Sequence, residues 1–165
     1  MNQLVKVVKV GIADLKYVKA PDTIRTTGLG SCVGLVIYDE RKEIAGLAHI
    51  MLPDSSLSKT EMVNKAKYAD TAVNELIQYF EKDGTPIGAL KAKMAGGAQM
   101  FSFQPTSDIM RIGPRNVEAI KNELKKYGIP IVSEDVGGSS GRTIEFDPKT
   151  TILKVRTVNK GIKEI

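Results

Sequence analysis

The chain contains one cysteine and one histidine, Cys32 and His49, and their spacing is its most informative chemical feature. Two β-rich runs flank a polar break between them, a pattern that predicts a β-hairpin. A turn centred between Glu40 and Arg41 would pair residues whose numbers add up to 81, which makes the thiol and the imidazole direct cross-strand neighbours. Their Cβ atoms would then lie about 4.5–5.5 Å apart, close enough for the imidazole to take the thiol proton. A bulge or a longer loop would change this register.

The segment before Cys32 favours a catalytic interpretation of that cysteine. Gly28-Leu29-Gly30-Ser31 is small and flexible, so its backbone N–H groups could approach a substrate oxyanion without obstruction from side chains. A lone cysteine at the head of an apolar strand is also typical of a small buried hydrophobe, and a lone histidine is often structural. Under both of these alternatives the register of Cys32 and His49 would be accidental. The sequence therefore predicts an activated cysteine nucleophile with a histidine base.

A third group is needed to hold the imidazole in the productive tautomer. No carboxylate is placed for this task, because Asp54 lies five residues beyond His49 along an extended chain. Thr26 or Thr27 could offer a hydroxyl or a carbonyl group from an adjacent strand. Spacing alone does not choose between these two threonines.

Hydrophobic periodicity predicts the elements that must position these residues. Strands are expected at Val5–Ile12 with a continuation at Leu15–Val18, and then at Ile24–Thr27, Val33–Tyr38, Ile44–Ile50, Leu90–Met94, Ile129–Val132, Arg142–Phe146 and Thr151–Val158. Helices are expected at Tyr68–Glu81 and from Pro114 to a stop at Gly128, with an irregular loop at Gln99–Arg111. We therefore expect a single domain over residues 1–165, an α/β sandwich in which two main helices cover a mixed, largely antiparallel sheet.

Composition and charge argue against several other classes of protein. The net charge is +5, but the basic residues are scattered among acids and aromatic residues make up only 5%, so nucleic-acid binding is not expected. The apolar runs are far shorter than the roughly 20 residues of a membrane span, and no membrane insertion is expected. The lone cysteine favours a reducing compartment, so the expected location is the cytoplasm. The lack of a long apolar stripe makes a monomer the default state.

The sequence offers little for a metal or a phosphate group. One histidine and one cysteine do not supply the three or four ligands of a zinc site. Gly137–Arg142 has the composition of a phosphate-binding loop but lacks its Gly-Lys-Ser/Thr ending, and we interpret it as a tight turn. No metal and no cofactor are therefore expected.

Short motifs occur in a fixed order over nearly the whole chain, at Thr26–Cys32, Ala48–Ser55, Lys67–Asp70, Ala95–Met100, Ile112–Asn116 and Glu134–Gly138. In this order they resemble the CheD family, the bacterial chemoreceptor glutamine deamidases. The pairing of Gly-Ser-Cys with His-x-Met-Leu-Pro is the most specific part of the resemblance. The chain departs from the family's pattern at Phe101–Arg111.

The resemblance implies a Cys–His–Thr triad and an α/β sandwich similar to that of bacterial toxin deamidases. Cys32 matches the nucleophile and His49 the base, and the family's threonine lies six residues before the cysteine, which selects Thr26. The implied substrates are glutamine side chains in the helical cytoplasmic region of methyl-accepting chemoreceptors, and the implied partner is the phosphatase CheC. A thioester route also predicts cleavage of glutamate methyl esters.

A second hypothesis is an interaction module that works by docking to receptors or to CheC, with a cysteine of minor importance. This hypothesis predicts that Cys32→Ala keeps both partner binding and a chemotaxis phenotype close to that of the wild type.

Overall fold

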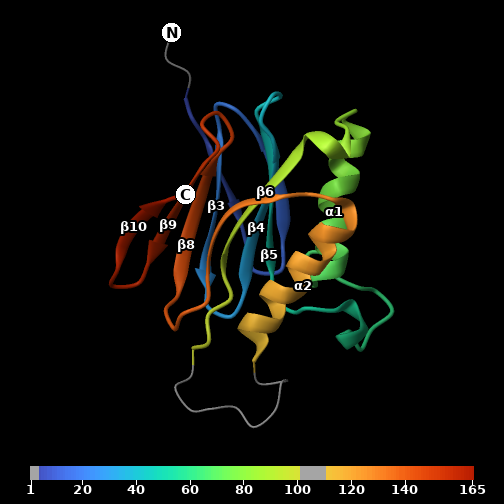
Figure 1. The fold of residues 1–165 in the computed structure, drawn as a ribbon, viewed down its shortest axis with the longest axis vertical. Helices are drawn as coiled ribbons and strands as arrows, with labels where there is room; N and C mark the ends of the chain where they lie inside the picture. The colour runs from blue at the N-terminus through green and yellow to red at the C-terminus, as the bar shows by residue number, and fades with distance from the viewer. Residues whose placement is uncertain (1–3, 101–110) are drawn as a thin grey trace.

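The computed structural model describes residues 4–100 and 111–165, so most of the loop expected at Gln99–Arg111 lies outside the described residues. In this part of the chain, ten strands and two α-helices form three layers (Figure 1). The strands are β1 (Val7–Val10), β2 (Leu15–Lys19), β3 (Thr23–Leu29), β4 (Val33–Asp39), β5 (Ile44–Ile50), β6 (Leu90–Gly96), β7 (Ile131–Val136), β8 (Arg142–Asp147), β9 (Ile152–Thr157) and β10 (Gly161–Glu164). The α-helices are α1 (Ala69–Lys82) and α2 (Ile112–Tyr127), and 3₁₀ turns lie at Ser55–Leu57 and Ile87–Ala89.

The strands form two sheets of five. The central sheet has the order β2-β5-β4-β6-β7 and is covered on one face by both helices, while the outer sheet has the order β1-β3-β8-β9-β10 (Figure 1). Each sheet is mixed, because β1–β3 and β6–β7 pair in parallel and the other neighbours are antiparallel. The α/β class with a mixed, largely antiparallel arrangement is confirmed, but in two sheets where one was expected.

The strand at Leu15–Lys19 does not continue the first strand. Ala13 adopts a left-handed backbone conformation with φ 57°, and the chain changes direction between β1 and β2. As a result β1 pairs with β3 in the outer sheet and β2 pairs with β5 in the central sheet. The expectation of a continuation is therefore wrong, and so is the early end predicted for the strand after Gly128, which runs to Val136.

Both predicted helices are confirmed within two residues of their expected ends. Helix α1 buries residues spaced three and four apart, which places them on one stripe: Ala69, Ala72, Val73, Leu76, Ile77 and Phe80. Helix α2 starts at Ile112, which puts Pro114 in the first turn, and it ends at Gly128, whose φ of 70° suits a glycine cap. Among the described helices, none is long and apolar enough to cross a membrane.

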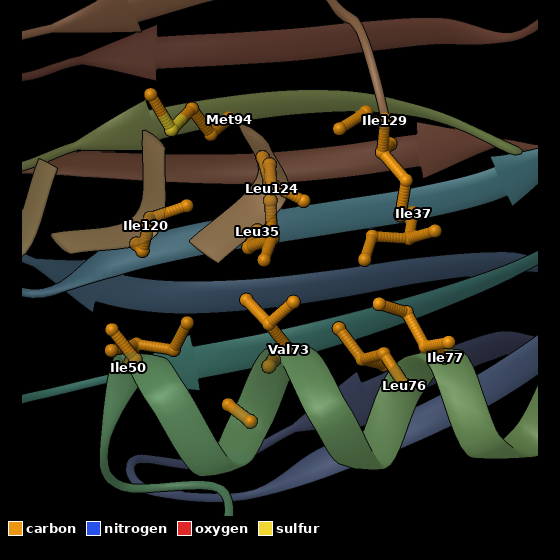
Figure 2. Packing of buried hydrophobic residues seen from close by; sticks show 14 of the residues in the cluster. Leu35, Ile37, Ile50, Val73, Leu76, Ile77, Met94, Ile120, Leu124 and Ile129 are labelled. Carbon is orange, nitrogen blue, oxygen red and sulfur yellow. The ribbon is translucent and has the colours of Figure 1, made fainter. Parts of the chain in front are cut away.

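The central sheet separates two hydrophobic cores. Leu35 and Ile37 of β4 face the helices, as Figure 2 shows, whereas Val36 and Tyr38 pack into the core between the two sheets. Every residue of β4 and β5 is buried, because both faces of these strands are covered. Even-numbered residues of β4 and odd-numbered residues of β5 therefore point toward the outer sheet, and His49 is among them.

The register of the β4–β5 hairpin differs from the prediction. Asp39 pairs with Ile44 and Gly34 pairs with His49, so paired residue numbers add up to 83 and the turn is one residue further along than expected. The Asp39 carboxylate accepts hydrogen bonds from the N–H groups of Arg41 and Lys42, which stabilises this longer turn. Cys32 is therefore not directly opposite His49. The residue opposite His49 is Gly34, two positions after Cys32. Because side chains alternate with a period of two, this shift keeps Cys32 and His49 on the same face.

Candidate active site

Cys32, His49 and Thr26 lie at one end of the space between the two sheets. Thr26 belongs to β3 of the outer sheet, and His49 lies near the end of β5 in the central sheet. Cys32 ends the short crossover, residues 30–32, that carries the chain from one sheet to the other. Only 1% of Thr26 and 0% of His49 are exposed, while Cys32 is partly buried against the core between the sheets. The two sheets together thus bring the three predicted residues to one region.

The hydrogen bonds of Thr26 determine the tautomer of His49. Thr26 Oγ1 lies 2.8 Å from the carbonyl oxygen of Val10 and 2.7 Å from Nδ1 of His49. A carbonyl only accepts, so the single hydroxyl proton of Thr26 is donated to Val10. The hydroxyl oxygen must then accept a hydrogen bond from Nδ1–H of the imidazole. Nε2 consequently carries a free lone pair, which is the state required of a general base.

The thiol and the imidazole share one face without a direct hydrogen bond. Cys32 precedes Gly34 by two residues, and Gly34 is the residue opposite His49, so the pair is diagonal across the hairpin. Diagonal neighbours are about 7–8 Å apart, which is within reach of an imidazole ring. Nε2 of His49 is buried and forms no hydrogen bond with any residue that the structure describes. Catalytic hydrogen bonds are often long in the absence of substrate and shorten when it binds.

Burial favours the neutral form of both groups. Desolvation raises the pKa of the Cys32 thiol above its ordinary value, an effect partly offset by a hydrogen bond from the residue's own backbone N–H. Desolvation likewise lowers the pKa of His49. At neutral pH the pair is therefore a thiol and a neutral imidazole rather than a preformed ion pair. A reaction that used this sulfur as a nucleophile would therefore require transfer of the thiol proton during the attack.

The crossover before β4 is held by hydrogen bonds to three successive carbonyl groups. The carbonyl of Gly30 accepts from the N–H of Ala98 at 2.9 Å, and that of Cys32 accepts from the N–H of Gly97 at 2.9 Å. The carbonyl of Ser31, between them, accepts from the side-chain amide of Asn116 at 3.0 Å. These contacts fix the backbone that carries Cys32.

Close packing explains the glycines around this crossover. A Cβ atom at Gly96 would collide with the carbonyl oxygen of Cys32, and Gly96 also has a φ of 119°, which favours glycine. A Cβ atom at Gly113, in the first turn of α2, would collide with the carbonyl oxygen of Ala98. The segment after β6 is therefore packed tightly between the crossover and helix α2.

Reasoning from the sequence placed Asn116 and the Gly96–Gly97 pair in motifs of the CheD resemblance but gave them no structural or chemical role. The two glycines after a strand are a recognised signal of close backbone approach and could have been interpreted in that way. The contacts of Asn116 could not be predicted from the sequence, because its partners are distant along the chain. Among the described residues, no group of three or more His, Cys, Asp and Glu side chains is placed to hold a metal ion.

A histidine oriented by a hydroxyl group, on the same face as a lone cysteine, is the arrangement used by cysteine hydrolases, here at the seam of a two-sheet α/β fold. The family model described as CheD chemotactic sensory transduction matches residues 51–157, and this chain belongs to the CheD family. That match begins after Thr26, Cys32 and His49, but the similarity to curated relatives spans nearly the whole chain.

Three relatives named chemoreceptor glutamine deamidase CheD illustrate this similarity. The protein of Bacillus subtilis (strain 168) is 62% identical over 159 residues, which cover 96% of each chain. The Bacillus velezensis protein is 63% identical over 155 residues, or 94% of this chain and 93% of the relative. The Halalkalibacterium halodurans protein is 62% identical over 159 residues, which cover 96% of this chain and 98% of the relative. A solved structure, the hypothetical protein YfiH of Bacillus licheniformis, gives a TM-score of 0.46 with 14% identity over 76% of this chain and 50% of that one.

Proposed function

We propose that this chain is a chemoreceptor glutamine deamidase, a cysteine-dependent hydrolase that converts glutamine side chains of chemotaxis receptors to glutamate. Relatives that carry this name are about 60% identical to the chain over nearly its full length. The observation that carries the proposal is the hydrogen-bond chain from His49 through Thr26 to Val10, which leaves Nε2 of the histidine free to act as a base. Buried polar atoms are usually hydrogen-bonded, so a histidine with a solely structural role would be expected to use both of its ring nitrogens.

In the first half of the reaction, Nε2 of His49 takes the proton of the Cys32 thiol while the sulfur attacks Cδ of the substrate glutamine. The carbonyl oxygen becomes an oxyanion, which accepts hydrogen bonds from backbone N–H groups at the crossover. The imidazolium then gives its proton to the leaving nitrogen as the C–N bond breaks. The products of this half are ammonia and a thioester between Cys32 and the former glutamine side chain.

In the second half, His49 removes a proton from a water molecule that attacks the thioester carbon. Collapse of the second tetrahedral intermediate breaks the C–S bond, and the thiolate regains its proton from the imidazolium. The net reaction consumes one water and releases one ammonia and a glutamate side chain. No step requires a metal or a cofactor. A glutamate methyl ester would form the same thioester with methanol as the leaving group, which makes methylesterase activity a part of the proposal.

The proposed setting follows from the same reaction. The substrate is the helical cytoplasmic region of methyl-accepting chemoreceptors, the enzyme works in the cytoplasm as a monomer, and CheC is its regulatory partner. Neither nucleic acid nor membrane insertion forms part of this function, consistent with the scattered basic residues.

Mass spectrometry of a receptor cytoplasmic fragment incubated with the protein tests the proposed function. Each converted glutamine raises the peptide mass by about 1 Da, since an amide becomes an acid. We expect a small number of specific sites to be converted in proportion to time and enzyme concentration. A fragment that remains unchanged at equimolar enzyme would rule out the deamidase proposal.

Thr26→Val is expected to lower the deamidation rate by about 10- to 100-fold, because the isosteric methyl group no longer accepts from Nδ1 and the productive tautomer is lost. Thr26→Ser keeps the hydroxyl group and should retain activity within a few-fold of the wild type. The comparison uses initial rates from the mass-spectrometric assay. Equal activities of the valine and serine variants would show that the hydroxyl has no role in orienting His49.

A further inference from the structure

Asn116 joins the two segments that carry the proposed nucleophile and base. It lies in the second turn of α2 and none of its surface is exposed. Its Nδ2 donates to the carbonyl of Ser31, at 3.0 Å, and to the carbonyl of Met51, at 2.9 Å. An amide nitrogen has two protons, so both of its donor positions are used. Ser31 directly precedes Cys32, and Met51 follows His49 by two residues.

We propose that Asn116 is a positioning residue for the reaction: it orients the Ser31–Cys32 peptide so that the Cys32 N–H faces the reacting sulfur and the oxyanion. This inference rests on the proposed function. It adds a residue that acts through the backbone of Cys32 and does not itself touch the substrate.

The geometry of the peptide unit carries the inference. In a trans peptide the C=O of one residue and the N–H of the next point in opposite directions within one plane. Asn116 holds the carbonyl of Ser31 on the side of helix α2, so the N–H of Cys32 must point away from that helix. This same N–H acts to lower the pKa of the Cys32 thiol, against the larger effect of burial. An amide of the nucleophile itself is also a common oxyanion donor in acyl transfer.

Asn116 is distinguished from the other groups that hold the crossover. The carbonyls of Gly30 and Cys32 accept from main-chain N–H groups of Ala98 and Gly97, which substitution of a side chain does not remove. The carbonyl of Ser31 accepts from a side chain, so its orientation depends on one residue. The second bond, to Met51, ties the segment that follows His49 to the same amide nitrogen. Loss of the Asn116 side chain should therefore leave both the orientation of the Cys32 N–H and the position of the segment after His49 less well defined.

The decisive variant is Asn116→Leu, which keeps the approximate volume, removes both donors and excludes a replacement water. Because Cys32 is the only cysteine, alkylation by iodoacetamide reports on its thiolate without any substrate. We expect the alkylation profile to move toward higher pH by about one unit, which is about a tenfold lower rate at any pH on its rising limb. In the deamidation assay we expect kcat to fall by about 10- to 100-fold while KM stays within about twofold.

Leu124→Ala is the matched control, because Leu124 is buried in the same helix and belongs to the hydrophobic core beside it. It should lower the unfolding midpoint without moving the alkylation profile. If Asn116→Leu does not fold, Asn116→Ala replaces it, with a smaller shift in the same direction because a water can enter. An unchanged profile and kcat in the folded variant, or an equal shift in Leu124→Ala, would overturn the positioning role. A wild type that does not deamidate would overturn the proposed function instead, and the alkylation result would still decide the role of Asn116.

Discussion

Cys32→Ala is expected to reduce deamidation of a receptor fragment by on the order of 10⁵-fold, because only substrate binding and oxyanion stabilisation would then remain. The bond-forming atom is lost, and no second cysteine in the chain can replace it. The measurement is the mass-spectrometric assay, extended to long incubation so that a small residual rate is visible. Cys32 is only partly buried, so the smaller alanine should leave the fold intact.

Cys32→Ser provides the matched control for this result. Serine keeps the polar group and nearly the same volume, but its hydroxyl is a far weaker acid than a thiol, so it should also be inactive. Both variants should unfold at urea concentrations close to that of the wild type. Deamidation at the wild-type rate by the alanine variant would rule out the thioester mechanism and favour the interaction-module hypothesis. Retained receptor binding by an inactive variant would show that docking and catalysis are separable.

His49→Gln is expected to lower kcat/KM by about 10³- to 10⁴-fold at neutral pH, because no group then accepts the thiol proton during attack. The remaining rate should rise about tenfold per pH unit, since hydroxide alone would then generate the thiolate. In the wild type, by contrast, activity should be retained into mildly acidic solution and fall only when the imidazole becomes protonated. Burial lowers the pKa of His49, so this acid limb should lie below the ordinary pKa of histidine.

The same residue should give stability a pH dependence of known sign. The pKa of His49 is lower in the folded state than in the unfolded chain, so between the two values the unfolded chain binds more protons. The contribution of neutral His49 to the free energy of unfolding should therefore be complete above about pH 6.5. It should decrease as the pH falls toward the folded-state pKa of this residue. Urea unfolding of the wild type and of His49→Gln at several acidic pH values separates this contribution from that of other groups. An identical decrease in both proteins would contradict it.

Much of the fold follows from local patterns in the sequence. The stripe of apolar residues on α1 and the glycine after α2 predict both helices closely, because these signals depend on neighbours within a few residues. The hairpin β4–β5 is likewise predicted from its two apolar runs and polar turn. The face shared by Cys32 and His49 is also correct, since it depends only on the alternation of side chains.

Features that depend on distant pairing were not predicted. The turn of the hairpin is longer than expected, because the Asp39 carboxylate accepts a hydrogen bond from a backbone N–H group within it. The longer turn moves the register away from a direct Cys32–His49 pair. Local periodicity does not show which strands share a sheet, so the division into two sheets was missed, as was β10 at the outer edge. Asn116 was missed for the same reason, because its partners lie 85 and 65 residues away in the sequence.

The hydrogen bond between Thr26 and His49 spans the two sheets, and this has a consequence for newly made protein. β3 is flanked in its sheet by β8, which follows Thr26, Cys32 and His49 in the chain and therefore leaves the ribosome after them. When all three proposed catalytic residues have left the ribosome, the nascent chain still lacks β8, the strand that pairs with β3 and holds Thr26 in place. Full reactivity of the sulfur should thus begin only after β8 has been synthesised, which spares neighbouring proteins from attack by chains that are still incomplete at that point.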